Sequence, residues 1–166
     1  VALSLASGKG TQDADFLPYT INSQIATDAL PASNLDGEMT LTRYDLTLTS
    51  NPVKRLRVRG SVAYDERDND TRQRAYTSIV HTDLFPVLDD RVNPVYGYER
   101  LRVFGSADFE VYDTLSVGAG GEWRSLDRTG TDQDVMSEET NDGWARVQYR
   151  PPGYLGFVLK GGAMER

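Results

Sequence analysis

The residues of this chain that could do chemistry form no catalytic set. The only histidine, His81, falls in a segment that we expect to be a loop, and a lone loop histidine is usually a solvated residue. No Ser-His-Asp arrangement, nucleophile elbow or phosphate-binding loop can be assembled without choosing partners arbitrarily. We therefore predict that the protein is not an enzyme and that the chain binds no cofactor of its own.

A run of carboxylates is the one candidate metal site. Residues 65–70 read Asp-Glu-Arg-Asp-Asn-Asp, and oxygen ligands placed close together are what calcium prefers. The run lacks the glycine and the distal glutamate of an EF-hand loop, and Arg67 supplies a competing cation. Asp65, Asp68 and Asp70 are thus weak calcium candidates, with a solvated or salt-bridged loop as the default interpretation.

Cysteine is absent, which removes several kinds of site. The 166 residues contain no cysteine, so disulfides, thiolate metal sites and a C-x-x-C-H haem attachment are all excluded. The net charge of -7 disfavours nucleic acid as a partner, because phosphate binding needs a basic surface. The chain begins in the middle of an expected strand, at Val1, which we interpret as a cut.

The positions of the basic residues follow from β-structure. From Arg55 to Tyr64, arginines alternate with Leu56, Val58 and Val62, and a period of two places successive side chains on opposite faces of a strand. Similar alternation predicts an all-β antiparallel up-and-down meander of about seven strands. The expected strands lie near residues 1–8, 36–49, 54–65, 97–112, 114–126, 142–150 and 154–165.

The connections between these strands alternate in length. Three are tight turns rich in Asn, Asp, Pro or Gly, at 50–53, 112–114 and 151–153. Three are long, at 10–35, 66–96 and 127–141. A meander sorts such connections to opposite ends of the sheet, as in outer-membrane barrels with short periplasmic turns and long extracellular loops. No apolar run approaches the roughly 20 residues of a membrane helix, whereas the mean hydropathy of -0.50 is compatible with spanning strands.

Each predicted strand then has a wet face and an apolar face. Aromatic residues near strand ends suit a membrane interface or, alternatively, cap a soluble core. Met39 and Leu41 are out of phase with the rest of their strand, and a bulge near Thr42 would re-phase it. The expected lumen-facing residues are Arg55, Arg57, Arg59, Arg102, Asp108, Glu110, Glu122, Arg124, Arg146, Arg150 and Lys160. The expected lipid-facing residues are Leu56, Val58, Val62, Tyr64, Leu101, Val103, Phe109, Leu115, Val117, Trp123, Val147, Tyr149, Phe157 and Leu159. Two interpretations of the lumen-facing charges stay open, cross-strand ion pairing and contact with a protein in the lumen.

Several segments, in order, resemble the MtrB/PioB family of decahaem-associated outer-membrane barrels. The most specific stretch is a strand, turn, strand and acidic loop over residues 35–69, which includes Leu35-Asp36-Gly37, Thr49-Ser50-Asn51-Pro52, Leu56-Arg57-Val58 and Tyr64 to Asn69. The similarity extends to Phe16-Leu17-Pro18-Tyr19-Thr20 before it, and to Tyr98-Glu99-Arg100 and Glu138-Glu139-Thr140 after it.

This resemblance implies a barrel in the bacterial outer membrane, surrounded by lipid, that sheathes a multihaem c-type cytochrome in a trans-membrane electron conduit. Its partners would be periplasmic and cell-surface multihaem cytochromes, and the haem would belong to them. Some family members carry a cysteine pair that this chain lacks. Seven strands are too few for such a barrel, so residues 1–166 are expected to be one partial barrel unit, an internal fragment incomplete at both ends.

Two other functions remain open from the sequence. A diffusion porin or receptor barrel predicts the same strands around water or a plug. A soluble β-sheet binding module would place Leu56, Val58, Val103 and Val117 in an ordinary core.

Overall fold

The protein is built from antiparallel strands. The structure, a computed structural model, describes residues 1–82, 85–130, 136–153 and 155–166, with the backbone alone for those within 78–90. This part of the chain contains strands and no helix, so it contains no helix long and apolar enough to cross a membrane. The strands are β1 (Ala2–Gln12), β2 (Gly37–Val53), β3 (Leu56–Asn69), β4 (Ala75–Thr82), β5 (Phe85–Val92), β6 (Gly97–Tyr112), β7 (Leu115–Thr129), β8 (Ser137–Tyr149) and β9 (Phe157–Glu165).

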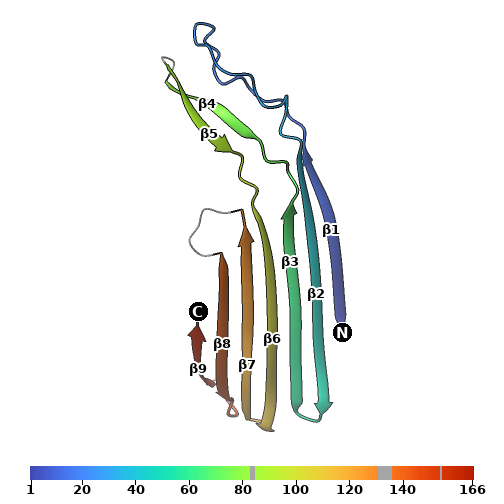
Figure 1. The fold of residues 1–166 in the computed structure, drawn as a ribbon. Coiled ribbons are helices and arrows are strands. Elements are labelled where there is room, and N and C mark those ends of the chain that lie inside the picture. The colour runs from blue at the N-terminus through green and yellow to red at the C-terminus, as the bar shows by residue number, and fades with distance from the viewer. Residues whose placement is uncertain (83–84, 131–135, 154) are drawn as a thin grey trace.

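Seven of these strands form one sheet in the order β1-β2-β3-β6-β7-β8-β9, and every neighbouring pair is antiparallel (Figure 1). The order of the seven strands in the sheet is also their order along the chain, which confirms the predicted all-β meander. The short turns lie at one end of the sheet and the long connections at the other (Figure 1). Within the described residues, β1 and β9 do not pair with each other, so this sheet is open.

The second long connection differs from the expected loop. It contains the hairpin of β4 and β5, a separate two-stranded sheet beyond the long-loop end of the main sheet (Figure 1). His81 therefore belongs to a strand, and the prediction of a loop there is wrong. The strands of the main sheet also run farther toward this end than expected, as with β3 to Asn69 and β7 to Thr129. Polar side chains had hidden these extensions, because a strand beyond the apolar band loses its two-faced pattern.

The bulge expected near Thr42 is absent. The register between β2 and β3 runs without interruption from Met39, opposite Asn69, to Ser50, opposite Val58. Met39 and Leu41, the apolar residues that break the alternation, lie at the long-loop end of β2, beyond its apolar part. No bulge is therefore needed to bring them onto the apolar face. The ladder shifts instead between Ser50 and Val53, around Pro52, which has no N–H to donate.

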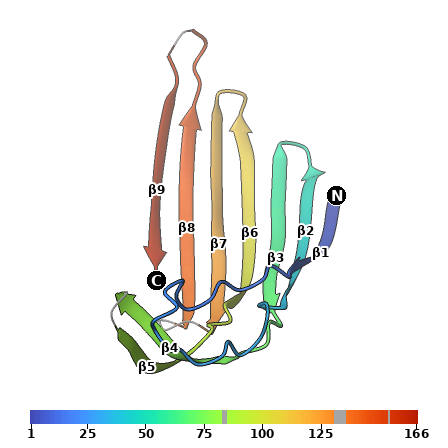
Figure 2. The same ribbon diagram turned by 90° about the horizontal axis from the view of Figure 1, so that it is seen from above.

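The sheet has no hydrophobic core. Among the described residues no hydrophobic side chain is buried, and the buried polar ones are Ser106 and Thr140. Figure 2 shows the reason, since the seven strands form a single layer with nothing stacked on either face. Large apolar side chains such as Leu46 and Leu48 remain more than 40% exposed. A soluble module with an ordinary core does not fit this arrangement, because such a core requires a second layer.

The long connections at one end contact each other. The first connection folds back on itself, with an isolated bridge between Asp15 and Asn34. It also packs against the start of β4, where the rings of Phe16 and Tyr76 meet edge to face at 5.9 Å. The Thr77 hydroxyl also donates to the Asp28 carboxylate at 2.8 Å. The two connections therefore form one substructure above the sheet (Figures 1 and 2).

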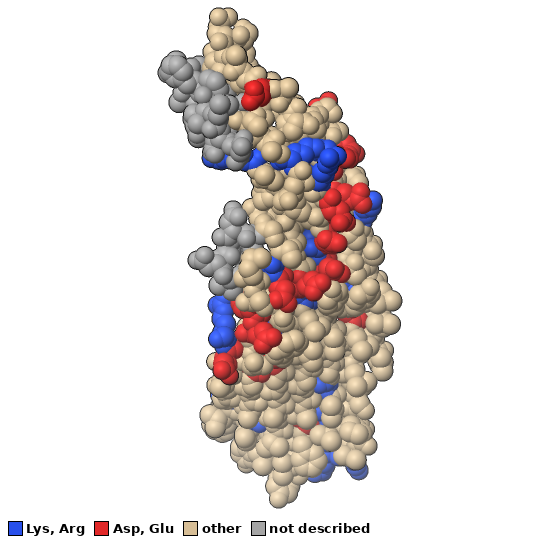
Figure 3. All heavy atoms as spheres, viewed as in Figure 1, with Lys and Arg blue, Asp and Glu red and all other residues tan. Residues whose placement is uncertain are grey.

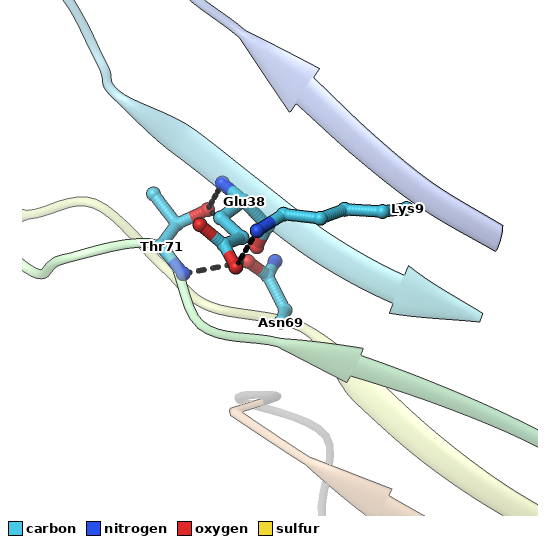
Figure 4. A network of polar contacts seen from close by, with 4 residues as sticks. All are labelled: Lys9, Glu38, Asn69 and Thr71. Atoms are coloured by element: carbon cyan, nitrogen blue, oxygen red, sulfur yellow. Dashed lines mark hydrogen bonds and ion pairs between the residues drawn. The ribbon is translucent and has the colours of Figure 1, made fainter. Parts of the chain in front are cut away.

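A polar network links neighbouring segments at the same end of the sheet, around the start of β2 (Figure 4). The Glu38 backbone N–H donates to the Thr71 hydroxyl at 3.1 Å, and that hydroxyl donates back to the Glu38 carbonyl at 3.3 Å. The Asn69 side chain accepts from the Thr71 N–H, an Asx-type turn that redirects the chain after β3. Lys9 of β1 pairs with the Glu38 carboxylate at 2.5 Å. The network joins β1, β2 and the segment after β3.

Candidate functional site

The sheet separates its side chains into two faces. Residues directly opposite each other in an antiparallel pair point to the same side, so the register assigns every position to a face. In one such row Arg57, Asp108, Gly118, Arg146 and Lys160 lie side by side from β3 to β9. Nine of the eleven residues expected to face the lumen lie on this side by register, and we call this side the polar face. The other two, Arg55 and Arg150, lie just outside β3 and β8 and line the hollow at the short-turn end of this face.

The opposite side, the apolar face, carries all fourteen residues expected to face lipid. One of its rows runs Leu56, Phe109, Val117, Val147 and Leu159 from β3 to β9. Most of these side chains are exposed or half-buried, as the single layer requires.

Basic side chains concentrate at the short-turn end of the polar face. Here the sheet is hollowed over about 710 Å³. The charged residues that line this basic hollow are Lys54, Arg55, Arg57, Arg59, Arg146 and Arg150, against Asp108 and Glu110. Six cations thus face two carboxylates in a chain whose overall charge is negative.

The cations of the basic hollow are only partly neutralised. Arg146 pairs with Asp108 at 2.5 Å, and Arg55 pairs at 2.6 Å with Asp113 in the neighbouring turn. Arg57 and Arg59 are exposed, and within the described ranges neither makes an ion pair. An unpaired guanidinium in an open hollow is available to an anionic partner.

Arg150 is bound by a neutral group. With its oxygen turned toward Arg150, the Gln148 amide accepts two hydrogen bonds of 2.8 Å from the guanidinium. This contact orients the arginine and leaves its charge in place.

Trp144 is a polar-face residue that sequence reasoning missed. It lies next to Arg146 and Lys160, whose cationic groups are 5.9 Å and 5.1 Å from the centroid of its ring. The indole lies against Gly120, where an added Cβ atom would be 2.8 Å from Trp144 Cζ2. The signal was available, because residue 144 shares its parity with Arg146 and Gln148, but an aromatic residue was not expected on the wet face.

The long-loop half of the polar face is charged in a different way, because most of its cations lie in ion pairs. Within the described residues Arg67 and Arg102 are its cations without one. The pairs are Arg43–Asp45 at 2.7 Å, Arg100–Asp65 at 3.5 Å, Arg124–Glu122 at 2.9 Å and Arg128–Glu138 at 3.6 Å. Cross-strand and same-strand ion pairing therefore accounts for this half, whereas it does not account for the basic hollow.

Two groups at the long-loop end have shifted pKa values. A hydrogen bond from Arg166, together with the charge of Arg128, lowers the pKa of the Glu138 carboxyl. A hydrogen bond to Asp65, with some desolvation, raises the pKa of the Tyr98 phenol. Both shifts favour the protonation states that these pairs have at neutral pH.

The three calcium candidates do not converge. Asp65 lies on the polar face beside Arg100, whereas Asp68, three positions along the same strand, lies on the apolar face. The Asp70 backbone N–H donates to the Glu38 carbonyl across the end of β2. Within the described ranges no group of three or more His, Asp or Glu side chains could hold a metal ion.

Comparisons with known proteins identify the family of this chain. The model of the family described as "Putative outer membrane beta-barrel porin, MtrB/PioB" matches residues 1–166. The chain belongs to the MtrB/PioB family. It is also 25% identical over 144 residues, 87% of its length, to outer membrane protein MtrB of Shewanella baltica (strain OS185). The chain spans 19% of the length of that relative.

Membership confirms the predicted outer-membrane location and the predicted barrel architecture. The MtrB/PioB family is a family of porin-like barrels and not of enzymes. The open seven-stranded sheet is what one section of a barrel wall looks like when considered alone, because a barrel is a sheet closed on itself.

The apolar face of this MtrB/PioB sheet ends abruptly in a band of carboxylates toward the long loops. Figure 3 shows the band crossing the molecule obliquely, with a surface below it that is almost free of charge. Lys9, paired with Glu38, is the one cation that the register places in the band within the described residues. The register assigns to this acidic band Glu38, Glu66, Asp68, Glu99, Asp127, Glu139 and Glu165.

Aromatic residues of the apolar face gather at two levels. Tyr44 and Tyr64 stack at 5.9 Å on the side of the acidic band, and Trp123 lies close to their level. Tyr149 and Phe157 lie opposite each other near the short turns.

Proposed function

We propose that this sheet is part of the wall of a larger outer-membrane barrel, with its apolar face toward lipid and its polar face toward the lumen. The observation that carries the proposal is a single-layer sheet of the MtrB/PioB family whose large apolar side chains are uncovered on one face and whose charges occupy the other. In a lipid bilayer the uncovered face is favourable, because lipid chains replace the missing protein layer.

The acidic band supports this placement. Carboxylates cannot lie in hydrocarbon, so the band marks the upper limit of the lipid chains. Glu38 is level with Asp70, the residue after β3, whereas Glu165, five strand spacings away, is level with Val62. At about 4.8 Å per strand and about 3.3 Å per residue, the band crosses the strands at roughly 45°. Strands of membrane barrels tilt by about this angle.

The acidic band and the aromatic level near the short turns give the thickness of the apolar region. Glu139 of the band and Tyr149 lie on the same face of one strand, β8, ten residues apart. This separation is ~33 Å along the strand, which a tilt of roughly 45° reduces to ~23 Å. The apolar band of outer-membrane barrels is about 25 Å tall.

The function that we propose for the complete barrel is to sheathe a multihaem c-type cytochrome, so that electrons cross the outer membrane along the haems of that partner. Membership of the MtrB/PioB family supports this role, and so do the charged side chains that the polar face offers to a protein in the lumen. The barrel would insulate and position the cytochrome, because a closed wall satisfies every backbone group in lipid. Periplasmic and cell-surface multihaem cytochromes would be its partners.

The test is purification of the full-length barrel from its native membrane through a tag on the barrel. We expect c-type haem absorbance to co-purify with the barrel in a fixed ratio, and the barrel without its partner to conduct ions poorly or fold poorly. A diffusion porin is the alternative, because the family description includes the word porin. A full-length barrel that is free of haem and conducts ions in planar bilayers would establish that alternative and exclude the sheath.

A further inference from the structure

The basic hollow differs from the rest of the polar face in a way that the sheath role alone does not require. Ion pairs hold most cations of the long-loop half, as between Arg100 and Asp65, whereas six cations face two carboxylates in the hollow. Like charges gathered on one surface repel each other and destabilise the free barrel. A complementary anionic surface would remove this repulsion when it binds.

The size of the hollow indicates the kind of anion. Its cations extend from Arg57 and Arg59 on β3 to Arg146 on β8, three strand spacings away, or ~14 Å. A single phosphate or carboxylate would reach one or two of these side chains. A protein surface that carries several carboxylates would reach them all.

The chemistry of the cations agrees with this choice. Arginine forms two parallel hydrogen bonds to a carboxylate, and Arg57 and Arg59 are exposed on one strand at neighbouring positions of the same face. Arg55 and Arg146 are already held in ion pairs by Asp113 and Asp108, so their side chains are less free to turn toward a partner.

We propose that the basic hollow is a docking site for an acidic patch of Asp and Glu side chains on the protein that occupies the lumen, and that Arg57 and Arg59 are its principal contacts. The inference rests on the proposed sheath function. It adds where the barrel contacts the protein in its lumen and which charges the two surfaces carry there. Docking at the short-turn end would fix the depth to which the occupant enters the barrel.

The first experiment measures haem retained per full-length barrel after tag purification, at about 0.05 M and about 0.5 M salt. The Arg57→Glu/Arg59→Glu double variant should retain about tenfold less haem than the wild type at low salt, because both contacts become repulsive. High salt should reduce retention by the wild type, since screening weakens exposed ion pairs. Arg72→Glu, an exposed residue of the second long connection, is the control and should retain haem like the wild type.

Folding of each variant is checked separately through the heat-modifiable gel mobility of the barrel. The Arg57→Gln/Arg59→Gln variant, which adds no negative charge, should fold and should retain an intermediate amount of haem. Retention that is equal in the wild type and both double variants, at both salt concentrations, would overturn the docking site and leave the sheath function intact. A wild-type barrel that carries no haem partner at any salt concentration would overturn both.

The second experiment identifies the anion through Lys54, the lysine that lines the hollow. A water-soluble carbodiimide joins a lysine amine to a carboxylate in direct contact with it. Mass spectrometry should find Lys54 linked to an Asp or Glu peptide of the haem-bearing partner, and Lys54→Arg should abolish the link, because a guanidinium offers no amine for the coupling. A link to a haem propionate, or no link to the partner, would contradict a docked acidic protein surface.

Discussion

At the scale of single residues, the glycines of β7 determine how closely side chains can lie on the polar face. The Asp108 carboxylate crosses over Gly118 to reach Arg146, and the indole of Trp144 lies over Gly120. These glycines therefore mark close approach between side chain and strand, as glycines inside strands often do. A side chain at either position would displace the charged or aromatic group above it.

We expect Gly120→Ala to destabilise the barrel by about 1–3 kcal/mol. The new Cβ atom would be 2.8 Å from both the Gly105 carbonyl oxygen and Trp144 Cζ2, and the backbone oxygen cannot move without shifting β6. The measurement is the midpoint of urea unfolding of the full-length barrel in phospholipid vesicles. Gly105→Ala is the control, since nothing lies within 4 Å of its Cβ position, and an equal loss in both variants would refute the explanation.

At the scale of elements, each strand of the main sheet is amphipathic without being covered by protein. Leu48 of β2 is 45% exposed at mid-height of the apolar face, while its neighbour Thr47 points to the polar face. The two positions are neighbours on one strand and are both paired with β3, and they differ in the face to which their side chains point. The strand therefore offers a direct test of which face meets lipid.

Leu48→Arg should destabilise the barrel by about 2–4 kcal/mol, the cost of an arginine near the midplane of the bilayer. Thr47→Arg, one residue away, should change the free energy of unfolding by less than about 1 kcal/mol because its side chain enters a wet lumen. The free energies are obtained from urea unfolding in vesicles. The opposite order of the two variants would mean that the faces are assigned the wrong way round.

The long connections form a second kind of element, and Arg74 holds them together. Its guanidinium donates to the carbonyls of Asn34 at 3.2 Å and Leu35 at 2.7 Å, and so ties the first connection to the second. Charged donors to backbone carbonyls contribute about 1.5–3 kcal/mol each where they are shielded from water.

Arg74→Ala should therefore make the first connection more sensitive to protease, with no change in the unfolding midpoint of the sheet. The assay is limited subtilisin digestion of vesicles that contain the full-length barrel, followed by mass spectrometry of the fragments from residues 13–36, which contain no Lys or Arg for trypsin to cut. Arg72→Ala should be cut like the wild type, because the contact of Arg72 is made by its backbone carbonyl. Unchanged cleavage in Arg74→Ala would show that the aromatic contact of Phe16 suffices.

At the scale of the whole molecule, charge and chain connectivity give the barrel a direction. The long connections and the acidic band lie at one end, and the short turns and the basic hollow lie at the other (Figures 1 and 3). Outer-membrane barrels place short turns in the periplasm, so the basic hollow would open toward the periplasmic side. A partner that enters the lumen from the periplasm would meet the hollow first.

Single cysteines test this orientation, and residues 1–166 contain no cysteine of their own. Ser23→Cys, exposed in the first long connection, should react with a membrane-impermeant maleimide on intact cells. Asn51→Cys, exposed near the short-turn end of β2, should react only after the outer membrane is permeabilised. Native cysteines elsewhere in the full-length barrel would be replaced first, and the reverse labelling pattern would invert the orientation.

The sequence by itself determined the strands of the main sheet and the face on which each side chain lies. These are local properties, because a period of two sends alternate residues of any strand to opposite sides. The same reasoning assigned Arg57 and Leu56 to opposite faces, as the register does, but missed Trp144, because an aromatic residue on the wet face contradicts the usual pattern. It also missed β4 and β5, whose sequences lack a clear alternation of polar and apolar residues.

Only the tertiary structure decided how positions on different strands combine. The basic hollow joins Lys54, Arg59 and Arg150, which are far apart in the sequence and come together through the register of four strands. The oblique acidic band depends in the same way on the stagger from β2 to β9. Register between strands is a non-local property, set by many pairings at once, so the alternation within each strand cannot reveal it.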